Sequence, residues 1–287
     1  MIPVEKKIPY GLHSLDEDDI QAVVEVLRNG PITQGDFVQE FGEALANYVG
    51  ADYCVAVSNG TAALHLAVSA LGIGSGDEVI TTPLTFCATA NAALYQGATV
   101  RFVDIDEKTL NLNPALIEQQ ITDRTKAIMP VDFRGHPSDL PQIKEIADRH
   151  GLKVIEDGSH SIGSNYTYKG QSYSCGDGVH ADLSTFSFHP VKHITTGEGG
   201  AVLTNDPTID EKVRRLRTHG ITKNPKMLEE NEGSWYYEVH EIGYNYRITD
   251  FQCALGSNQL KKLNQFVKKR RKIAKKYDIC FLFPSHD

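Results

Sequence analysis

The chain has 287 residues, of which 40% are hydrophobic and 23% charged, and its formal net charge is -8. This composition suits one large or two modest globular domains, argues against disorder, and excludes a surface that wraps a nucleic acid. The five cysteines are scattered, odd in number and never paired as CxxC, which predicts reduced thiols rather than a disulfide framework. No apolar signal-peptide core and no run of ~18 apolar residues is found, so we expect a cytoplasmic protein.

Two amphipathic helices are predicted near the start of the chain, over residues 16–27 and 36–49. From residue 53 onward, strand-like runs alternate with helical patterns. The predicted strands are residues 53–57, 78–82, 99–103, 126–131, 153–155, 183–188 and 201–204. The predicted helices between them are residues 61–71, 86–95, 114–121 and 140–150. This alternation predicts an α/β fold with a mostly parallel seven-stranded sheet between helices, and ligands at the carboxyl ends of its strands.

The last part of the chain has a different pattern. Residues 220–243 lose the periodicity and hold the only tryptophan, Trp235, among several tyrosines, as expected of a loop that binds or packs against something. A long helix is predicted over residues 249–276, with nine basic residues from Lys261 to Lys276 that indicate a solvated face. We therefore predict a large α/β domain over residues 1–250, and a helix that begins a second, small domain over residues 251–287.

Lys192 lies on a predicted turn between two strands, after Pro190 and before Gly197. A lysine in this position could hold a carbonyl cofactor as a Schiff base, or it could be a solvated loop residue. His189 and His193 are four residues apart, which on a helix would be metal spacing. Because Pro190 and the glycines oppose a helix, no metal site is predicted.

Two other strand ends carry groups that could bind a ligand. Gly60 and Thr61 follow the first strand and open a helix, where free backbone N–H groups suit a phosphate, although Thr61 could simply cap its helix. Asp157 ends the buried run at residues 152–155, where a carboxylate is costly without a cation or donors, although it could be a turn aspartate. With Ser187 and Phe86, these residues and Lys192 are the parts that pyridoxal 5'-phosphate requires: a phosphate site, an anion for the pyridine nitrogen, an amine and a stacking face.

The ordered motifs resemble those of the DegT/DnrJ/EryC1/StrS sugar-nucleotide aminotransferases. They are Ser58–Leu64 (SNGTAAL), Thr81–Thr89 (TTPLTFCAT), Glu156–Gly163 (EDGSHSIG), Ser187–Lys192 (SFHPVK), Gly197–Gly200 (GEGG) and Gly243–Asp250 (GYNYRITD). The resemblance covers nearly all of residues 8–278 and implies the fold-type I, aspartate-aminotransferase-like fold. Within the family, residues 31–35 and 189–200 are most similar to the transaminases of pseudaminic acid biosynthesis, which act on a UDP-linked 4-keto-6-deoxy sugar.

The resemblance also implies roles for individual residues. Lys192 is the residue to which the cofactor is attached and which moves the proton, and Asp157 pairs with the pyridine nitrogen. The remaining implied cofactor contacts are His160 near the phenolic oxygen, Phe86 on the ring, Gly60, Thr61 and Ser187 at the phosphate, and Asn245 at the phosphate of a partner subunit. Arg247 is a weaker candidate for substrate contact. A homodimer with shared active sites, with L-glutamate as the amino donor in a ping-pong cycle, is therefore expected.

One feature departs from the family pattern. Family members continue into a small C-terminal domain, whereas this sequence stops at Asp287. The expectation from this departure is that the domain is largely missing, which keeps open an inactive remnant that binds the cofactor. Aminotransferases of dTDP- or GDP-linked keto sugars are a further alternative. The related sugar 3-dehydratases carry histidine in place of the lysine, and Lys192 argues against that activity.

Overall fold

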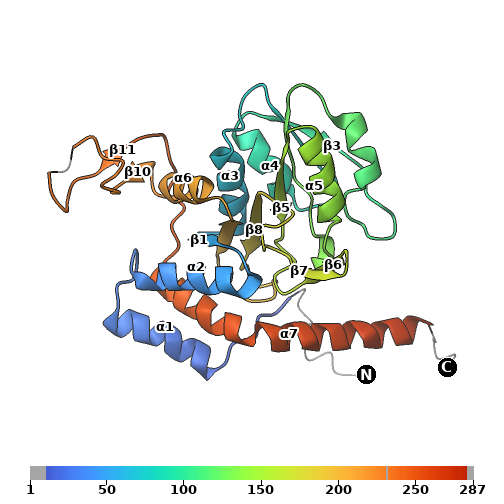
Figure 1. Cartoon of the computed structure of the whole chain (residues 1–287). Coiled ribbons are helices and arrows are strands. Elements are labelled where there is room, and N and C mark those ends of the chain that lie inside the picture. The colour runs from blue at the N-terminus through green and yellow to red at the C-terminus, as the bar shows by residue number, and fades with distance from the viewer. Residues whose placement is uncertain (1–10, 231, 283–287) are drawn as a thin grey trace, which may run out of the picture.

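The computed structural model describes residues 11–230 and 232–282, and a seven-stranded sheet forms its centre (Figure 1). The strands are Tyr53–Val57 (β1), Glu78–Thr81 (β2), Thr99–Phe102 (β3), Thr125–Ile128 (β4), Lys153–Asp157 (β5), Leu183–Ser187 (β8) and Gly200–Thr204 (β9). Their order is β1-β9-β8-β5-β4-β2-β3, and β9 runs antiparallel to both neighbours while the other pairs are parallel. The carboxyl ends of six strands therefore share one edge, and the predicted mostly parallel sheet is confirmed.

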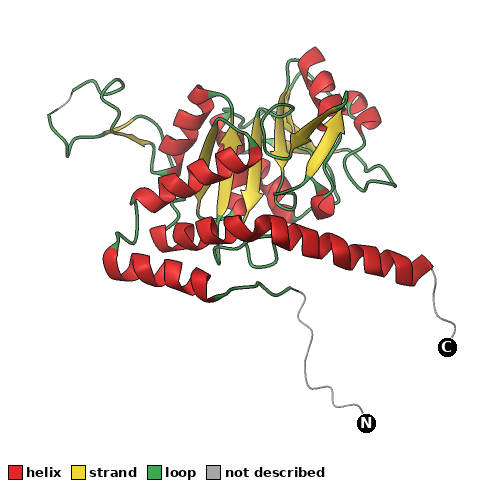
Figure 2. Ribbon diagram, turned by 60° about the horizontal axis from the view of Figure 1, so that its bottom comes forward, coloured by secondary structure: helices red, strands yellow, loops and turns green. Residues whose placement is uncertain are grey.

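Helices cover both faces of the sheet (Figure 2). The core on one face joins β1 side chains such as Val55 to Gly60–Ala70 (α3), Cys87–Tyr95 (α4) and Pro207–Arg217 (α6). On the other face, Ala56 and its neighbours face Asp36–Val49 (α2) and Asp250–Leu282 (α7), and Glu17–Asn29 (α1) packs against α7. Leu140–Arg149 (α5) covers β4 and β5. Successive strand residues point to opposite faces, so neighbours in the sequence enter different cores.

Two arginines of α6 cover the exposed edge of the sheet at β1. Arg214 Nη2 donates a hydrogen bond to the Cys54 carbonyl at 3.2 Å, and Arg217 Nη1 donates one to the Ala56 carbonyl at 3.0 Å. These bonds satisfy edge carbonyls that would otherwise be free to pair with another chain. The α6 helix is absent from the sequence prediction, although its Asp206 side chain caps the N-terminus and Pro207 stands in the first turn.

The predicted helix over residues 114–121 is wrong. The structure has two single turns of 3₁₀-helix, Pro114–Leu116 and Glu118–Gln120, separated by the fully buried Ile117. The segment is too short to offset the cost of nucleating an α-helix, and the core holds it at this one side chain. The hairpin of Asn165–Tyr168 (β6) and Gln171–Ser174 (β7) is not predicted either; its two-residue turn, Lys169-Gly170, has positive φ at both positions, as the tight hairpin turn requires.

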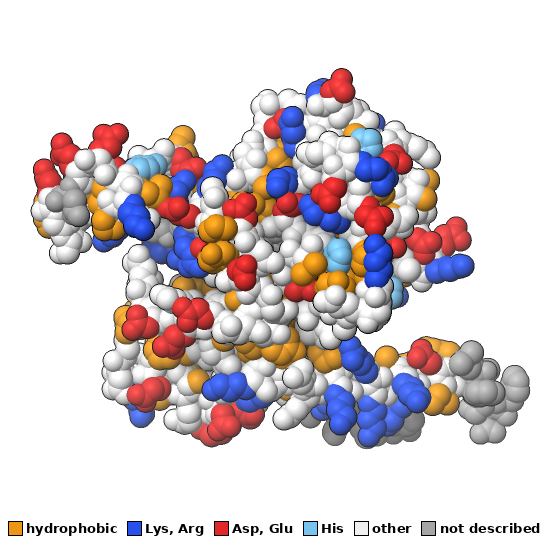
Figure 3. Space-filling model, in the orientation of Figure 1, with side chains coloured by type: hydrophobic (Ala, Val, Ile, Leu, Met, Phe, Trp, Pro, Cys, Tyr) orange, Lys and Arg blue, Asp and Glu red, His pale blue; other side chains and the backbone are white. Residues whose placement is uncertain are grey.

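The α7 helix is longer than predicted and has two different halves. Its first half packs on α1 and α2, and Cys253 and Leu263 belong to the same core as Phe186 of the sheet. Its second half is exposed and carries basic side chains that gather along it (Figure 3). The predicted domain boundary at residue 250 remains a prediction, and residues 283–287 of the predicted second domain lie outside the described residues. Over the part of the chain that the structure describes, no helix is both long and apolar enough to span a membrane.

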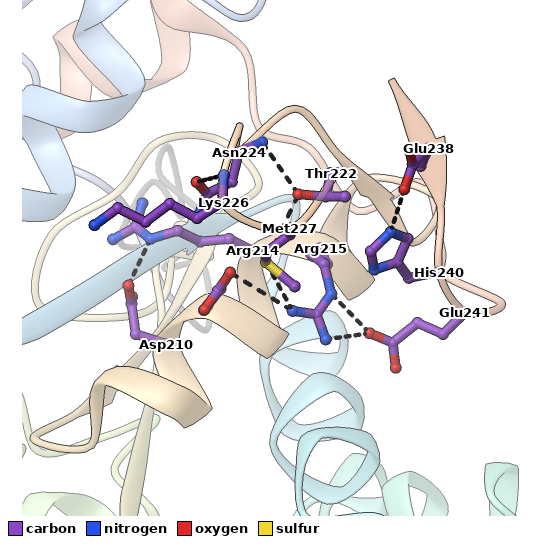
Figure 4. A network of polar contacts seen from close by, with 11 residues as sticks. Asp210, Arg214, Arg215, Thr222, Asn224, Lys226, Met227, Glu238, His240 and Glu241 are labelled. Carbon is purple, nitrogen blue, oxygen red and sulfur yellow. Dashed lines mark hydrogen bonds and ion pairs between the residues drawn. The ribbon is translucent and has the colours of Figure 1, made fainter. Parts of the chain in front are cut away.

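The aromatic segment 220–243 extends from the body beside α6 (Figure 1) and contains a short hairpin, Ile221–Thr222 (β10) and Glu238–Val239 (β11). Arg215 of α6 anchors its base, because Nε and Nη2 donate to Glu241 Oε1 at 3.1 and 2.9 Å (Figure 4). Trp235 keeps 66% of its surface exposed. The segment is thus tied to the body at its base and presents aromatic surface beyond it.

Candidate active site

The first turn of α3 packs directly on the ends of two strands. Val57, Gly200 and Ser187 are aligned across β1, β9 and β8 at the carboxyl edge of the sheet. A Cβ added at Gly60 would lie 2.8 Å from Ser187 Cβ, and one added at Gly200 would lie 2.5 Å from the Asn59 carbonyl oxygen. Glycine at both positions therefore allows the backbone N–H groups of the helix start to meet the Ser187 hydroxyl, which is an arrangement suited to an anion.

Thr61 does not cap this helix. The N-cap is Asn59, whose side-chain oxygen accepts a hydrogen bond from the Ala62 N–H at 2.8 Å. The alternative that Thr61 caps its helix is therefore wrong, because Asn59, two residues earlier, already supplies the cap. The Thr61 hydroxyl stands in the first turn of α3, next to Gly60.

The Asp157 carboxylate is held by donors from two elements. Asp157 is the last residue of β5 and only 4% exposed. Its Oδ2 accepts a hydrogen bond from Thr89 Oγ1 at 2.7 Å, and its Oδ1 accepts one from the Ser159 N–H at 3.2 Å. Thr89 belongs to α4 and is itself hydrogen-bonded to the Thr85 hydroxyl at 2.7 Å. Sequence reasoning missed Thr89, although its spacing of four from Thr85 at a helix start was a usable signal.

Lys192 stands on a bend between β8 and β9, as predicted, and its backbone is held at both ends. Its N–H donates to the His189 carbonyl at 2.8 Å, and Arg270 Nη2 of α7 donates to the Lys192 carbonyl at 2.9 Å. Burial lowers the pKa of the Lys192 amine, and the Asp157 carboxylate partly opposes this shift. A lysine whose pKa is lowered by burial is a better nucleophile near neutral pH than a solvated one.

Two histidines lie close to this lysine. Burial lowers the pKa of His160, and the Lys192 charge lowers it further. Burial also lowers the pKa of His193 to about 4, with smaller contributions from Arg270, His160 and Lys192. Both rings are therefore neutral near pH 7. A Cβ added at Gly135 would lie 2.6 Å from the His160 carbonyl oxygen and 3.8 Å from His193 Cε1, so a glycine separates the two histidine segments.

Phe86, Asn245 and Arg247 lie at the margins of this group. Phe86 is the N-cap residue of α4 and remains 70% exposed. Asn245 is exposed and forms a backbone bridge with Thr218, and the next carbonyl, that of Tyr246, accepts from the Ser58 N–H at 2.9 Å. Arg247 lines a separate cavity of about 220 Å³ beside Gln34, Arg214 and Arg217. The structure thus brings Gly60 to Ser187, and Asp157 near Lys192 and His160. In the described chain, it gives the Asn245 side chain no hydrogen bond to them.

Comparison with known proteins places this geometry in a family. The sequence model of the DegT/DnrJ/EryC1/StrS aminotransferase family matches residues 13–281 of this chain. A UDP-4-amino-4,6-dideoxy-N-acetyl-beta-L-altrosamine transaminase of Campylobacter jejuni is 45% identical over an alignment of 277 residues, and the match covers 94% of this chain and 69% of that protein. Helicobacter pylori PseC, an aminotransferase involved in the biosynthesis of pseudoaminic acid, superposes with a TM-score of 0.86 at 35% identity, covering 96% of this chain and 71% of PseC.

A third similarity concerns a structure that carries a cofactor. Bacillus subtilis NtdA with bound cofactor PMP matches with a TM-score of 0.75 at 33% identity, covering 87% of this chain and 54% of NtdA. The family and the fold class predicted from the sequence motifs are therefore confirmed. The match to the family spans nearly the whole sequence, and on this ground the chain belongs to the DegT/DnrJ/EryC1/StrS aminotransferase family.

Proposed function

We propose that the chain uses pyridoxal 5'-phosphate to transfer an amino group from L-glutamate to C4 of a UDP-linked 4-keto-6-deoxy sugar, in the biosynthesis of pseudaminic acid or a related surface glycan. The observation that carries this proposal is the half-buried Lys192, whose pKa is lowered by burial and which lies near a fixed Asp157 carboxylate. Family membership and the names of the relatives support the substrate class.

The residues present fit this cofactor. Gly60 packs closely against Ser187, so the backbone N–H groups at the start of α3 and the hydroxyls of Thr61 and Ser187 can bind the phosphate. The buried Asp157 provides the anion for the pyridine nitrogen, and the exposed ring of Phe86 at the start of α4 provides the stacking face. Pyridoxal phosphate supplies a carbonyl group that exchanges amines and a protonated ring that withdraws electrons.

The protein's own groups carry the proton transfers. Lys192 is the base, because its neutral amine accepts a proton from the substrate carbon and returns one. Thr89 and the Ser159 N–H orient the Asp157 carboxylate, so that its charge would be held for the pyridine nitrogen of the cofactor. His160 is neutral and near Lys192, which suits a hydrogen bond to the phenolic oxygen without a second positive charge. Charge and position support these proposed roles.

A panel of nucleotide sugars tests the proposed reaction. The protein, loaded with cofactor and given L-glutamate, is expected to release 2-oxoglutarate and form the amino sugar when the UDP-linked keto sugar is present. Turnover with only the GDP- or dTDP-linked sugars would contradict the UDP-linked substrate and identify an aminotransferase of those sugars instead. A yellow, cofactor-loaded protein that releases no 2-oxoglutarate with any of them would instead identify a remnant that binds the cofactor without catalysis.

The close contact of Gly60 predicts a specific loss of cofactor affinity. In the Gly60→Ala variant, the new Cβ meets Ser187 Cβ at 2.8 Å and pushes the helix start away from the strand end. We expect the dissociation constant for pyridoxal phosphate to rise about tenfold, equivalent to about 1.4 kcal/mol, measured by fluorescence titration. The control is Gly74→Ala, because nothing but the Gln96 carbonyl oxygen, at 3.7 Å, comes within 4 Å of a Cβ there. Equal affinities of the two variants would contradict a phosphate site at Gly60.

Asn245 is proposed to complete the phosphate site of a partner subunit in a homodimer. Its exposed side chain and its backbone tie through Tyr246 to Ser58 are compatible with this role. Mixing Lys192→Ala with Asn245→Ala protein is expected to restore about a quarter of the wild-type activity, because half of the dimers are mixed and each mixed dimer contains one unaltered site. If Asn245 acted within its own subunit, the mixture would stay inactive. Sedimentation of each variant serves as the control for dimer formation.

A further inference from the structure

A second acidic site lies behind Asp157, on the opposite face of β5. Glu156 precedes Asp157, and because strand residues alternate, its side chain points to the other core. Glu156 is 1% exposed and Asp132 is fully buried. One carboxylate oxygen of Asp132, one of Glu156 and the Sγ atom of Cys175 all lie within 4.8 Å of one another. Two carboxyl groups are therefore buried together, in a position that the cofactor roles proposed above do not use.

Two of the four carboxylate oxygens of this pair accept hydrogen bonds. Glu156 Oε2 accepts from Ser184 Oγ at 2.5 Å and from the Gly176 N–H at 3.0 Å, and Asp132 Oδ1 accepts from the Ser138 N–H at 2.8 Å. The other oxygens, Glu156 Oε1 and Asp132 Oδ2, are buried and have no donor among residues 11–230 and 232–282. If both groups were ionised, two buried negative oxygens would be left without any hydrogen bond, which is strongly unfavourable away from water.

We infer that Glu156 carries a proton near neutral pH and donates it from Oε1 to Asp132 Oδ2, so that the pair shares one negative charge and positions Asp157. This single proton satisfies both remaining oxygens. Burial raises the pKa of Glu156 well above its ordinary value, the Asp132 charge raises it further, and Ser184 and Gly176 oppose the shift. Two carboxyl groups this close cannot both ionise at low cost.

The other titratable groups around the pair do not supply a compensating cation. Burial raises the pKa of Cys175 and of Tyr166, which keeps the thiol and the phenol neutral, and burial also raises the pKa of Asp177. The neighbouring His160 has a lowered pKa and is neutral as well. A proton is therefore the positive charge that the described surroundings of the pair require.

The pair acts on Asp157 through the backbone. The Asp132 N–H donates to the Asp157 carbonyl at 3.1 Å, and the Asp157 N–H donates to the Pro130 carbonyl at 2.9 Å. The proposed bond between the Glu156 and Asp132 side chains therefore joins the end of β5 to the segment after β4, in addition to these two backbone hydrogen bonds. Both are positioning residues, and this part of the inference depends on the role proposed for Asp157 in cofactor binding.

Amide substitutions test the shared proton, because an amide reproduces only one protonation state. In Glu156→Gln, the NH₂ group replaces the carboxyl O–H as donor to Asp132, and the amide oxygen keeps the bonds from Ser184 and Gly176. In Asp132→Asn, the NH₂ group donates to an ionised Glu156. In the double variant, two NH₂ groups oppose each other without an acceptor. We expect both single variants to fold, and the double variant to raise the unfolding equilibrium constant about ten- to hundredfold beyond the product of the two single effects.

The pH dependence of unfolding provides the second measurement. The folded-state pKa of Glu156 is raised above its unfolded value, so its favourable contribution is fully present below the unfolded pKa and is lost as pH rises toward the folded pKa. Between about pH 5 and pH 7, the wild-type unfolding equilibrium constant should therefore rise about tenfold per pH unit relative to that of Glu156→Gln. Identical pH profiles would mean that Glu156 is ionised in the folded protein, and would overturn the inference.

Cofactor affinity separates this inference from the proposed function. Glu156→Gln should retain the wild-type dissociation constant for pyridoxal phosphate, whereas Glu156→Ala should raise it, because only the amide restores the bond to Asp132. Two results would contradict the shared proton. One is a double variant whose effect on unfolding equals the product of the two single effects. The other is a strongly destabilised Glu156→Gln protein together with a wild-type protein that added Zn²⁺ stabilises, which would point to a metal ion in place of the proton. If the wild type fails to bind pyridoxal phosphate, the proposed function fails, while the unfolding measurements on the full chain still decide the proton.

Discussion

Replacing Lys192 with alanine is expected to lower transamination by at least about a thousandfold, because the variant loses both the nucleophile and the proton carrier. Borohydride treatment of the wild-type protein should fix the cofactor to the peptide that contains Lys192, and the variant should yield no such peptide. The release of 2-oxoglutarate from L-glutamate measures turnover. The lowered pKa of this amine is the physical reason that it reacts in preference to solvated lysines.

A matched control distinguishes this site from lysine loss in general. Lys126 is exposed on β4, so Lys126→Ala should leave both the fixed peptide and the turnover unchanged. Recovery of a fixed cofactor on a different lysine, with full turnover in Lys192→Ala, would contradict the proposed role. Loss of turnover without loss of cofactor attachment would show that another amine holds the cofactor.

Replacing Asp157 with asparagine is expected to have the second largest effect. The amide keeps an oxygen for Thr89 or the Ser159 N–H but removes the charge. Removing one partner of a buried charge pair costs about 3–5 kcal/mol, so turnover should fall about a hundred- to a few thousandfold. The Asp157 charge also raises the pKa of Lys192, so its removal should lower that pKa further and shift the acidic limb of the pH–rate profile, where Lys192 loses its proton, to lower pH.

Surface and neighbouring variants provide the controls for Asp157. Asp148→Asn removes an exposed partner of Lys144 and should change turnover little, because surface ion pairs contribute little to stability. Thr89→Ser keeps the hydroxyl that orients Asp157 and should stay active, whereas Thr89→Val should lose part of the activity. A fully active Asp157→Asn protein with an unchanged pH profile would exclude a charge role for this residue.

Local patterns in the sequence determined most of the secondary structure. The predicted bounds of α2, residues 36–49, and of β1, residues 53–57, agree with those observed, because helical spacing and an apolar run are properties of a few adjacent residues. The same reasoning missed the β6–β7 hairpin and α6. Their side chains are largely polar, and they are stabilised by a tight turn or by contacts to the β1 edge, which local periodicity does not report.

For the site, the sequence determined which residue types end the strands, and the order of the motifs determined the family. Only the tertiary structure brought Thr89 to Asp157 across 68 positions and the α3 start onto Ser187. It also decided between the adjacent acids: strand alternation sends Glu156 toward Asp132 and Asp157 toward α4. The protonation of a carboxyl group depends on the charges and donors that surround it in space. Those neighbours come from distant parts of the chain, so only the assembled fold could identify them.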